Sequence, residues 1–247
     1  MAEGHDNQVD TRGPRVLAIV PARAGSKGIP RKNLARVGAN TLIGHACQVG
    51  LHSPSVGRVV VTSDDDEMGE EGLRNGADVF IRRPAHLASD NASSADAWRH
   101  AWIEAERELK ERFEISVWLQ PTSPTRTEAD VETTIKTLIS TEATAGVTVS
   151  PVPSHFAPHK QVKLESDGTI KPFVDGAVPN VQRQDLPRSY WLNGHCYAAR
   201  RETFLADAIV IPEGTVGVII NRPIANIDDP EDLEFAKWLM ERQRDRR

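Results

Sequence analysis

The first apolar run of the chain ends in a loop that is basic and contains two glycines. Val16–Val20, closed by Pro21, predicts a short buried strand. Gly25 and Gly28 let the backbone of the loop approach a ligand, because neither carries a Cβ. The cations of the loop are Arg23, Lys27, Arg31 and Lys32. A strand that feeds such a loop is how α/β folds hold nucleotide phosphates, and a solvated basic loop is the alternative.

Two better-known loop motifs do not fit this segment. A Walker A sequence needs an upstream glycine that is missing here, and Gly28 directly follows Lys27. Ser26 is not a hydrolase nucleophile, because Ala24 stands where G-x-S-x-G requires its first glycine. Pro30 also blocks the helix that should follow such a serine. The phosphate interpretation remains, and the serine-hydrolase interpretation is excluded.

Beyond the loop, apolar strands alternate with amphipathic helices. Further strands are expected at Val56–Thr62, Val79–Ile81, Ile115–Leu119, Gly146–Ser150 and Val216–Ile220, with another extended piece at Ala225–Ile227. Helices are expected at Leu42–Leu51, Glu67–Asn75, Ser93–Arg112, Ala129–Ser140 and Pro230–Arg244. Such alternation predicts a three-layer α/β/α fold with a mostly parallel sheet.

Three candidate ligand segments follow strands of this predicted sheet. They are the Arg23 loop, the region around Ser93, and Gln120–Arg126. Ligands of parallel sheets bind beyond the carboxyl ends of the strands, so we expect these segments to converge. Trp98 and Trp102 share one helix face and are assigned to the core.

The stretch Pro151–Asn193 differs from the rest in its many prolines and its weak apolar periodicity. Val162–Leu164 and Ile170–Phe173, on either side of Asp167-Gly168, predict a small β-hairpin. A linker is the alternative.

Composition limits the class of protein. A length of 247 residues fits one large α/β domain or two small ones, and a net charge of −5 argues against general nucleic-acid binding. No apolar run approaches the roughly 20 residues that cross a bilayer. The polar residues 1–14 are expected to form a mobile tail without a signal peptide, in a cytoplasmic protein. Cys47 and Cys196 are expected to be buried thiols.

Several segments resemble, in order and spacing, the CMP-sialic acid synthetases (acylneuraminate cytidylyltransferases). They are VPARAGSKGIPRKN (Val20–Asn33), RRPAHLASDNASS (Arg82–Ser94), LQPTSPTRT (Leu119–Thr127), NIDDPEDL (Asn226–Leu233) and, more weakly, RQDLPRSYWLNGHCY (Arg183–Tyr197). The resemblance implies a Rossmann-like sheet of the nucleotide-diphospho-sugar transferase type in a single domain, residues 15–247. It further implies that residues 151–193 project from this domain, help to build the sugar pocket and form a homodimer.

The activity implied by the resemblance is transfer of CMP from CTP to a nine-carbon 2-keto sugar acid, with release of pyrophosphate. Arg23 would hold phosphate near the α-position, Lys27 the departing end and Lys32 the transition-state charge. The nucleotide contacts carried over from the family are Ala22, Asn33, Arg83 and Ser94. For Asn33, a contact with the acceptor is the alternative to the ribose.

The acceptor side is carried over in the same way. Gln120 would contact the sugar acid, and the groups that would hold its carboxylate and ring are Lys160, Arg183 and Tyr197. For these last residues, surface charges on a projecting hairpin are the alternative. Asp228 would bind the metal, Mg²⁺ or Mn²⁺. The family usually has Asp-Ile-Asp where this chain has Asn226-Ile227-Asp228, so Asn226 is assigned as a partner of the metal without a charge.

Two other functions remain open at this point. An eight-carbon sugar acid or an acid from a specialised pathway could replace the nine-carbon acceptor. A non-catalytic nucleotide-binding module is the alternative from another class, and the joint presence of Arg23, Lys27, Lys32 and Asp228 argues against it.

Overall fold

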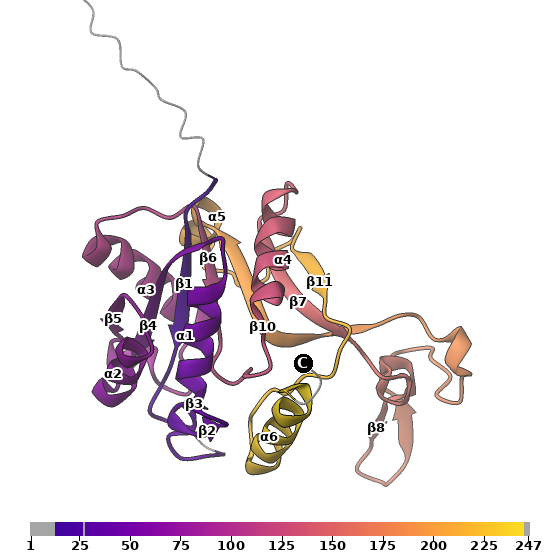
Figure 1. Cartoon of the computed structure of the whole chain (residues 1–247). Helices are drawn as coiled ribbons and strands as arrows, with labels where there is room; N and C mark the ends of the chain where they lie inside the picture. Colours follow the sequence, from indigo (N-terminus) through magenta and orange to yellow (C-terminus); the bar gives the residue numbers. More distant parts are fainter. Residues whose placement is uncertain (1–12, 27, 245–247) are drawn as a thin grey trace, which may run out of the picture.

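A seven-stranded sheet forms the centre of the molecule in the computed structural model, which describes residues 13–26 and 28–244 (Figure 1). Its strands are β1 (Val16–Pro21), β4 (Val56–Ser63), β5 (Val79–Arg82), β6 (Ile115–Trp118), β7 (Ala145–Pro151), β10 (Tyr190–Arg200) and β11 (Val216–Ile219). The spatial order is β11-β7-β10-β6-β1-β4-β5. Only β10 runs antiparallel to its neighbours in this sheet, so the mostly parallel sheet is confirmed.

Helices cover both faces of the sheet and give the expected three layers. They are α1 (Leu42–His52), α2 (Asp66–Arg74), α3 (Ser94–Leu109), α4 (Glu128–Ile139), α5 (Arg201–Asp207) and α6 (Pro230–Arg244). One apolar cluster joins the sheet to α1, α2 and α4, and a second joins its other face to α3 and α5. Trp98 and Trp102 are fully buried in the second cluster, where Trp98 lies 5.5 Å from Trp118, centroid to centroid, as expected of core residues.

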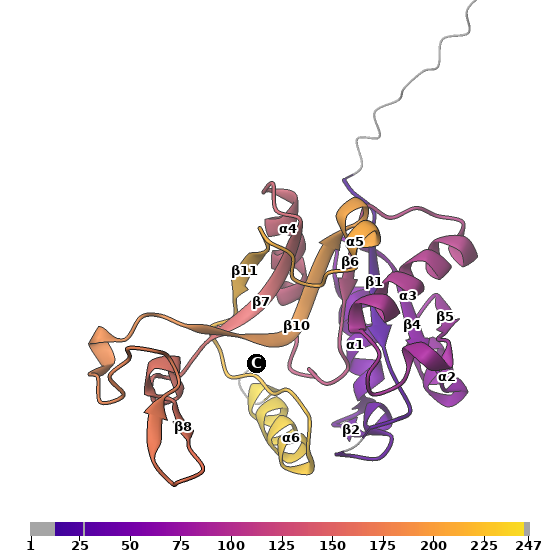
Figure 2. The ribbon, with the colours of Figure 1, turned by 180° about the vertical axis from the view of Figure 1, so that it is seen from behind.

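The C-terminal helix α6 lies at the carboxyl end of the sheet, beside the small hairpin of β2 (Arg36–Val37) and β3 (Asn40–Thr41) (Figure 2). A third apolar cluster, which includes Ile227 and Leu239, joins these parts. Asp229 caps α6, since its Oδ1 accepts from the Asp232 amide at 2.8 Å and its own amide donates back to the Asp232 carboxylate. This cap holds the segment that carries Asp228 at the end of the sheet.

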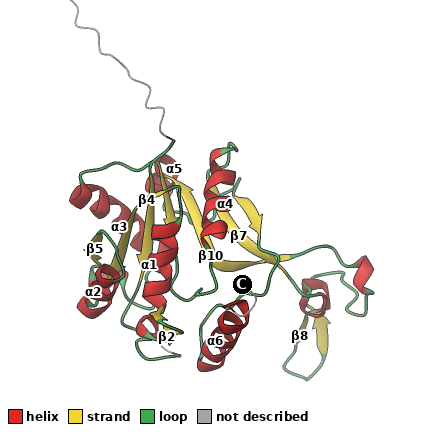
Figure 3. Ribbon diagram, in the orientation of Figure 1, coloured by secondary structure: helices red, strands yellow, loops and turns green. Residues whose placement is uncertain are grey.

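Residues between β7 and β10 project away from the body as an arm (Figure 3). The expected hairpin is confirmed, with β8 (Val162–Leu164) paired antiparallel to β9 (Ile170–Pro172). Single 3-10 turns flank it at Ser154–Phe156, Pro158–Lys160 and Arg183–Asp185. The exposed apolar side chains of the arm are Phe156, Val162, Leu164, Ile170, Phe173 and Val178. Its role in forming a dimer stays a prediction.

The structure corrects some expectations. The helix expected to reach Arg112 ends at Leu109, because Lys110 turns into the left-handed region with φ of 54°. Ala225–Ile227 is not a strand but a loop held to the turn after β6. The central strand β10 and the short α5 were not expected. In β10 a register shift between Leu192 and Tyr197 breaks the strand alternation. The expected tail at residues 1–14 lies mostly outside the described residues.

Both cysteines are buried and free, as expected. Burial raises the pKa of each thiol to about 12. Within residues 13–26 and 28–244, no helix is long and apolar enough to cross a membrane.

Candidate active site

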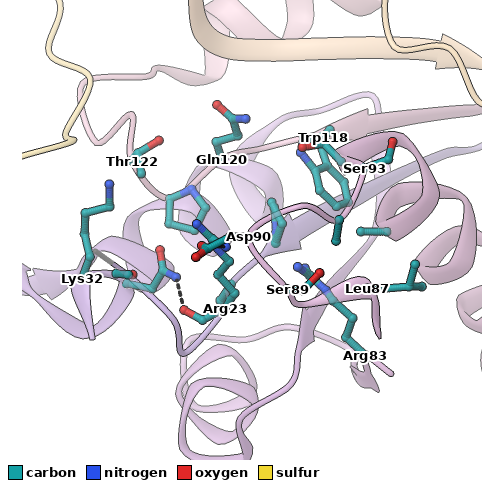
Figure 4. A pocket seen from close by; sticks show the side chains of 18 of the residues that line it. Arg23, Lys32, Arg83, Leu87, Ser89, Asp90, Ser93, Trp118, Gln120 and Thr122 are labelled. Atoms are coloured by element: carbon teal, nitrogen blue, oxygen red, sulfur yellow. Dashed lines mark hydrogen bonds and ion pairs between the residues drawn. The ribbon is translucent and has the colours of Figure 1, made fainter. Parts of the chain in front are cut away.

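A cavity of about 430 Å³ opens beyond the carboxyl ends of β1, β5 and β6. It lies at the topological switch point of the sheet. The strands β4 and β5 continue the sheet on one side of β1, and β6 continues it on the other side. Figure 4 shows Lys32 at one side of this cavity and Trp118 and Leu87 at the other. The predicted site residues that line it are Ala22, Arg23, Lys32, Asn33, Arg83, Ser94, Gln120 and Asp228. The expected convergence of three distant segments is therefore confirmed.

Neighbouring strands hold the basic loop in place. The Ala24 amide donates to the carboxylate of Asp64, which follows β4, at 3.0 Å. The Asn33 side chain is nearly buried and donates its amide hydrogen to the Arg23 carbonyl at 3.0 Å. Asn33 thus braces the loop, and its contact with a ligand stays a prediction. Lys27 lies outside the described residues.

Two of the described cations that line the cavity, Arg23 and Lys32, are each paired with an acid of the same lining. Arg23 Nη1 lies 2.8 Å from the Asp90 carboxylate, and about two fifths of each side chain is exposed. Lys32 Nζ donates to the Ile227 carbonyl at 2.7 Å and lies 3.3 Å from Asp228 Oδ1. The Arg23–Asp90 pair is exposed, and pairs of this kind stabilise a fold by about 0–1 kcal/mol, so an anion can exchange for Asp90 at little cost. At the other pair the Asp228 side chain is 83 % exposed, whereas that of Lys32 is 14 % exposed.

The opposite side of the cavity combines a buried arginine with apolar surface and a helix start. Arg83 is 6 % exposed and donates to the Thr62 carbonyl at 3.0 Å, and burial lowers its pKa to about 10. The Arg83 Nε atom has no partner among the described residues. Ser93 caps α3, since its Oγ accepts from the Ala95 and Asp96 amides, so Ser94 stands at the first, electropositive turn of the helix.

Gln120 belongs to a wall built around Gly194 of β10. Gly194 has φ of +74°, and a Cβ there would lie 3.1 Å from Gln120 Oε1 and 3.5 Å from Asn226 Nδ2. The Oδ1 atom of Asn226 is buried and finds no hydrogen-bond partner in the described chain. Asn226 itself is not among the residues that line the cavity.

The remaining predicted residues lie elsewhere in the single chain. Arg183 lines a separate hollow of about 620 Å³ at the base of the arm, together with Arg188. Lys160 sits in a 3-10 turn of the arm. Tyr197 stands opposite Trp118 in the sheet, where burial raises its pKa. Their roles toward an acceptor stay predictions.

One buried polar cluster next to the cavity was missed by the sequence analysis. Asp130 caps α4 with Thr127, and its carboxylate also meets His195 of β10 and Arg222 after β11. Arg126 lies beside them and donates to backbone carbonyls. The pattern T-x-x-D could have indicated the helix cap. No local signal shows that a histidine and an arginine 65 and 92 residues further along reach the same carboxylate.

Comparison with known proteins agrees with this geometry. A family model described as "Cytidylyltransferase" matches residues 17–202. An N-acylneuraminate cytidylyltransferase of Escherichia coli is 28 % identical over 93 % of this chain, which spans 53 % of that longer protein. A pseudaminic acid cytidylyltransferase of Campylobacter jejuni is 29 % identical over 90 % of this chain and 95 % of its own length.

A solved structure shares the fold. The CMP:2-keto-3-deoxy-manno-octonic acid synthetase in complex with CTP superimposes with a TM-score of 0.69 at 19 % identity, over 93 % of this chain and 99 % of that one. At this identity the likeness supports the fold alone. The resemblance first seen in the sequence segments is confirmed at the level of the family. By the match over residues 17–202, the chain belongs to the cytidylyltransferase family.

Proposed function

We propose that this chain transfers CMP from CTP to a nine-carbon 2-keto sugar acid. The acceptor hydroxyl at C2 attacks the α-phosphorus, the bond from this phosphorus to the bridging oxygen breaks, and pyrophosphate leaves with the bonding pair. The observation that carries the proposal is the single cavity in which Arg23, Lys32 and Asp228 meet opposite Arg83. Such chemistry depends on positioning the reactants and on neutralising the developing charge.

The phosphate side of the site uses the basic loop. Arg23 and Lys32 are held by exposed carboxylates that phosphate oxygens can replace. Arg23 then binds near the α-phosphate, and Lys32 stabilises the charge of the transition state. For Lys27 we propose a contact with the departing pyrophosphate.

The base side suits cytosine. A guanidinium offers donors only, and cytosine presents acceptors at O2 and N3, whereas uracil carries a hydrogen on N3. The free Nε of Arg83 provides such a donor at a nearly buried position. Ser94 adds a hydroxyl, and Ala22 allows the nucleotide to approach the end of β1. A wrongly paired base would leave Arg83 unsatisfied, which is the strongest way for a site to discriminate.

A divalent cation, Mg²⁺ or Mn²⁺, fits the donor set around Asp228. Mg²⁺ is usually held by one or two carboxylates together with substrate phosphates and waters. No group of three or more His, Cys, Asp or Glu residues among those described could hold a metal by itself, which agrees with an ion that arrives with the nucleotide. Asp228 would hold it, and the unpartnered Oδ1 of Asn226 is the second candidate oxygen. When bound, the ion would neutralise charge on the triphosphate.

The acceptor lies, in this proposal, against Gln120. Lys160, Arg183 and Tyr197 do not line the cavity of their own chain. We therefore propose a homodimer in which the apolar arm covers a second copy and brings Lys160 and Arg183 to its site. Tyr197 lies in β10 and not on the arm. Arm residues such as Leu164 and Ile170 are 76 % and 63 % exposed, which favours burial against a partner.

The experiment is pyrophosphate release from CTP with Mg²⁺ across a panel of sugar acids, with UTP and ATP as controls. Release with CTP and a nine-carbon acid supports the proposal. Release only with an eight-carbon acid favours the second candidate acceptor, the octonic acid of the structural neighbour. CTP binding without release under any acceptor would contradict enzymatic function and support a nucleotide-binding module.

A further inference from the structure

The buried cluster beside the cavity is larger than its local role requires. The helix cap needs only Thr127 and Asp130, and both of its reciprocal bonds are present. The Asp130 carboxylate also accepts from His195 Nδ1 at 3.1 Å and forms an ion pair with Arg222. Buried charges are costly unless they are paired and hydrogen-bonded. The extra partners therefore serve to join α4, β10 and the segment after β11 at one point.

From this carboxylate, a directed chain of hydrogen bonds leads toward Asp228. Thr125 Oγ1 lies 3.2 Å from His195 Nε2 and accepts from the Ala225 amide at 3.0 Å. Burial lowers the pKa of His195, and nearby Arg126 acts in the same direction against the hydrogen bond to Asp130. A neutral ring that donates through Nδ1 must accept at Nε2, so the Thr125 hydroxyl donates to it.

The next contacts reach the site itself. The Ile227 amide donates to the Thr122 carbonyl at 2.8 Å, and the Ile227 carbonyl accepts from Lys32. Asp228 follows directly, and its backbone oxygen stands where a Cβ on Gly28 would collide. A shift of residues 225–228 would thus move Asp228 and Lys32 together.

The same cluster holds Gln120, against which the acceptor is proposed to lie, and Gly194 beside it. These two residues are called the acceptor wall. Arg126 is 4 % exposed and donates to the carbonyls of both Gln120 and His195. Ser123 Oγ donates to the Gly194 carbonyl at 3.1 Å. Gln120 is therefore tied to the same strand as the histidine.

We propose that Asp130, His195, Arg222 and Thr125 form a largely buried hydrogen-bonded relay that positions Gln120 and Asp228 relative to each other for the incoming acceptor. The inference rests on the proposed function of the cavity. The relay residues are not among those that line it, so they are positioning residues. Disturbing them should impair use of the acceptor more than the affinity for CTP, because Lys32 and Asp228 move with residues 225–228 whereas Arg23 and Arg83 are held by other contacts.

The test compares Thr125→Val with Thr125→Ser. Valine keeps the shape and removes the hydroxyl, whereas serine keeps the hydroxyl. We expect Thr125→Val to lower kcat/KM for the acceptor on the order of tenfold or more, and to change the Kd for CTP by a clearly smaller factor. Thr125→Ser should restore most of the loss. Arg222→Gln, at a part-exposed side chain, is the second variant, and it decides the question if Thr125→Val does not fold.

Hydrogen exchange gives a readout that does not depend on turnover. In Thr125→Val or Arg222→Gln, the Ile227 amide should lose protection while amides of β1 keep theirs. The matched control is Arg201→Gln, which removes a part-buried ion pair with Glu106 far from the cavity and should change neither quantity. If both variants keep the wild-type protection of the Ile227 amide and the wild-type kcat/KM for the acceptor, the proposed relay is wrong. An inactive wild type would refute the proposed function, and exchange at Ile227 would still decide on the relay.

Discussion

Replacing Gly194 by alanine should impair the acceptor wall more than the fold. At φ of +74° a residue with a Cβ is strained. The cost is about 1–2 kcal/mol, which lowers Tm by roughly 2–8 °C in a domain of this size. The added methyl would also stand 3.1 Å from Gln120 Oε1 and 3.2 Å from Ser123 Oγ, closer than the usual contact of a Cβ. The Gln120 carboxamide must therefore move.

The control for this change is Gly214→Ala. Gly214 has φ of +80°, and a Cβ there would meet nothing within 4 Å. Both variants should lose a similar amount of stability in thermal unfolding. Only Gly194→Ala should raise KM for the acceptor, on the order of tenfold, with KM for CTP nearly unchanged. If the two variants share the same kinetics as well as the same Tm, Gln120 does not contact the acceptor from this wall.

Three other changes test separate parts of the account. Arg23→Ala or Lys32→Ala should reduce turnover on the order of 100-fold or more with little change in Tm, because neither side chain belongs to an apolar core cluster. A parallel loss of turnover and Tm would contradict this. Asn226→Asp should lower the Mg²⁺ concentration needed for half-maximal rate, whereas a changed acceptor profile would place this residue in the sugar pocket. Burial raises the pKa of Cys47 and Cys196 to about 12, above the value of 9.0 for a free thiol. The protonated thiols therefore make their full contribution to the free energy of unfolding below about pH 9, and this contribution is lost as the pH rises toward 12. Urea unfolding should give a lower free energy of unfolding at pH 10.5 than at pH 8, and equal values would refute this.

The sequence predicts the half of the sheet formed by β6, β1, β4 and β5 well, because each strand there carries a local signal. Val16–Val20 and Val56–Thr62 are apolar and β-branched, and Asp229-Pro230 marks the start of α6. The hairpin of β8 and β9 was likewise predicted from its turn residues Asp167-Gly168. These features depend on residues that are neighbours in the chain.

The parts that were missed depend on contacts between distant residues. Strand β10 contains Asn193, Gly194 and His195 at its break in register, so its alternation does not indicate a strand. Its place between β6 and β7 comes from pairing across the sheet. The meeting of His195 and Arg222 at Asp130 could not be expected either, since no spacing in the sequence encodes it.

The candidate site residues also fall into two groups, those whose position the sequence predicts and those whose position it does not. Residues in the segments after β1, β5 and β6 converge because parallel strands end at one edge of the sheet. Lys160 and Arg183 lie on the arm, which would meet an active site only in the proposed homodimer.

The most direct test of the central claim is ³¹P NMR of the wild-type reaction with CTP, Mg²⁺ and a nine-carbon 2-keto sugar acid. The account predicts that the triphosphate signals disappear while pyrophosphate and one new phosphodiester signal, the CMP-sugar, grow in equal amounts, and that UTP gives neither. Pyrophosphate with CMP but no phosphodiester, or an unchanged CTP spectrum for every sugar acid, would contradict it.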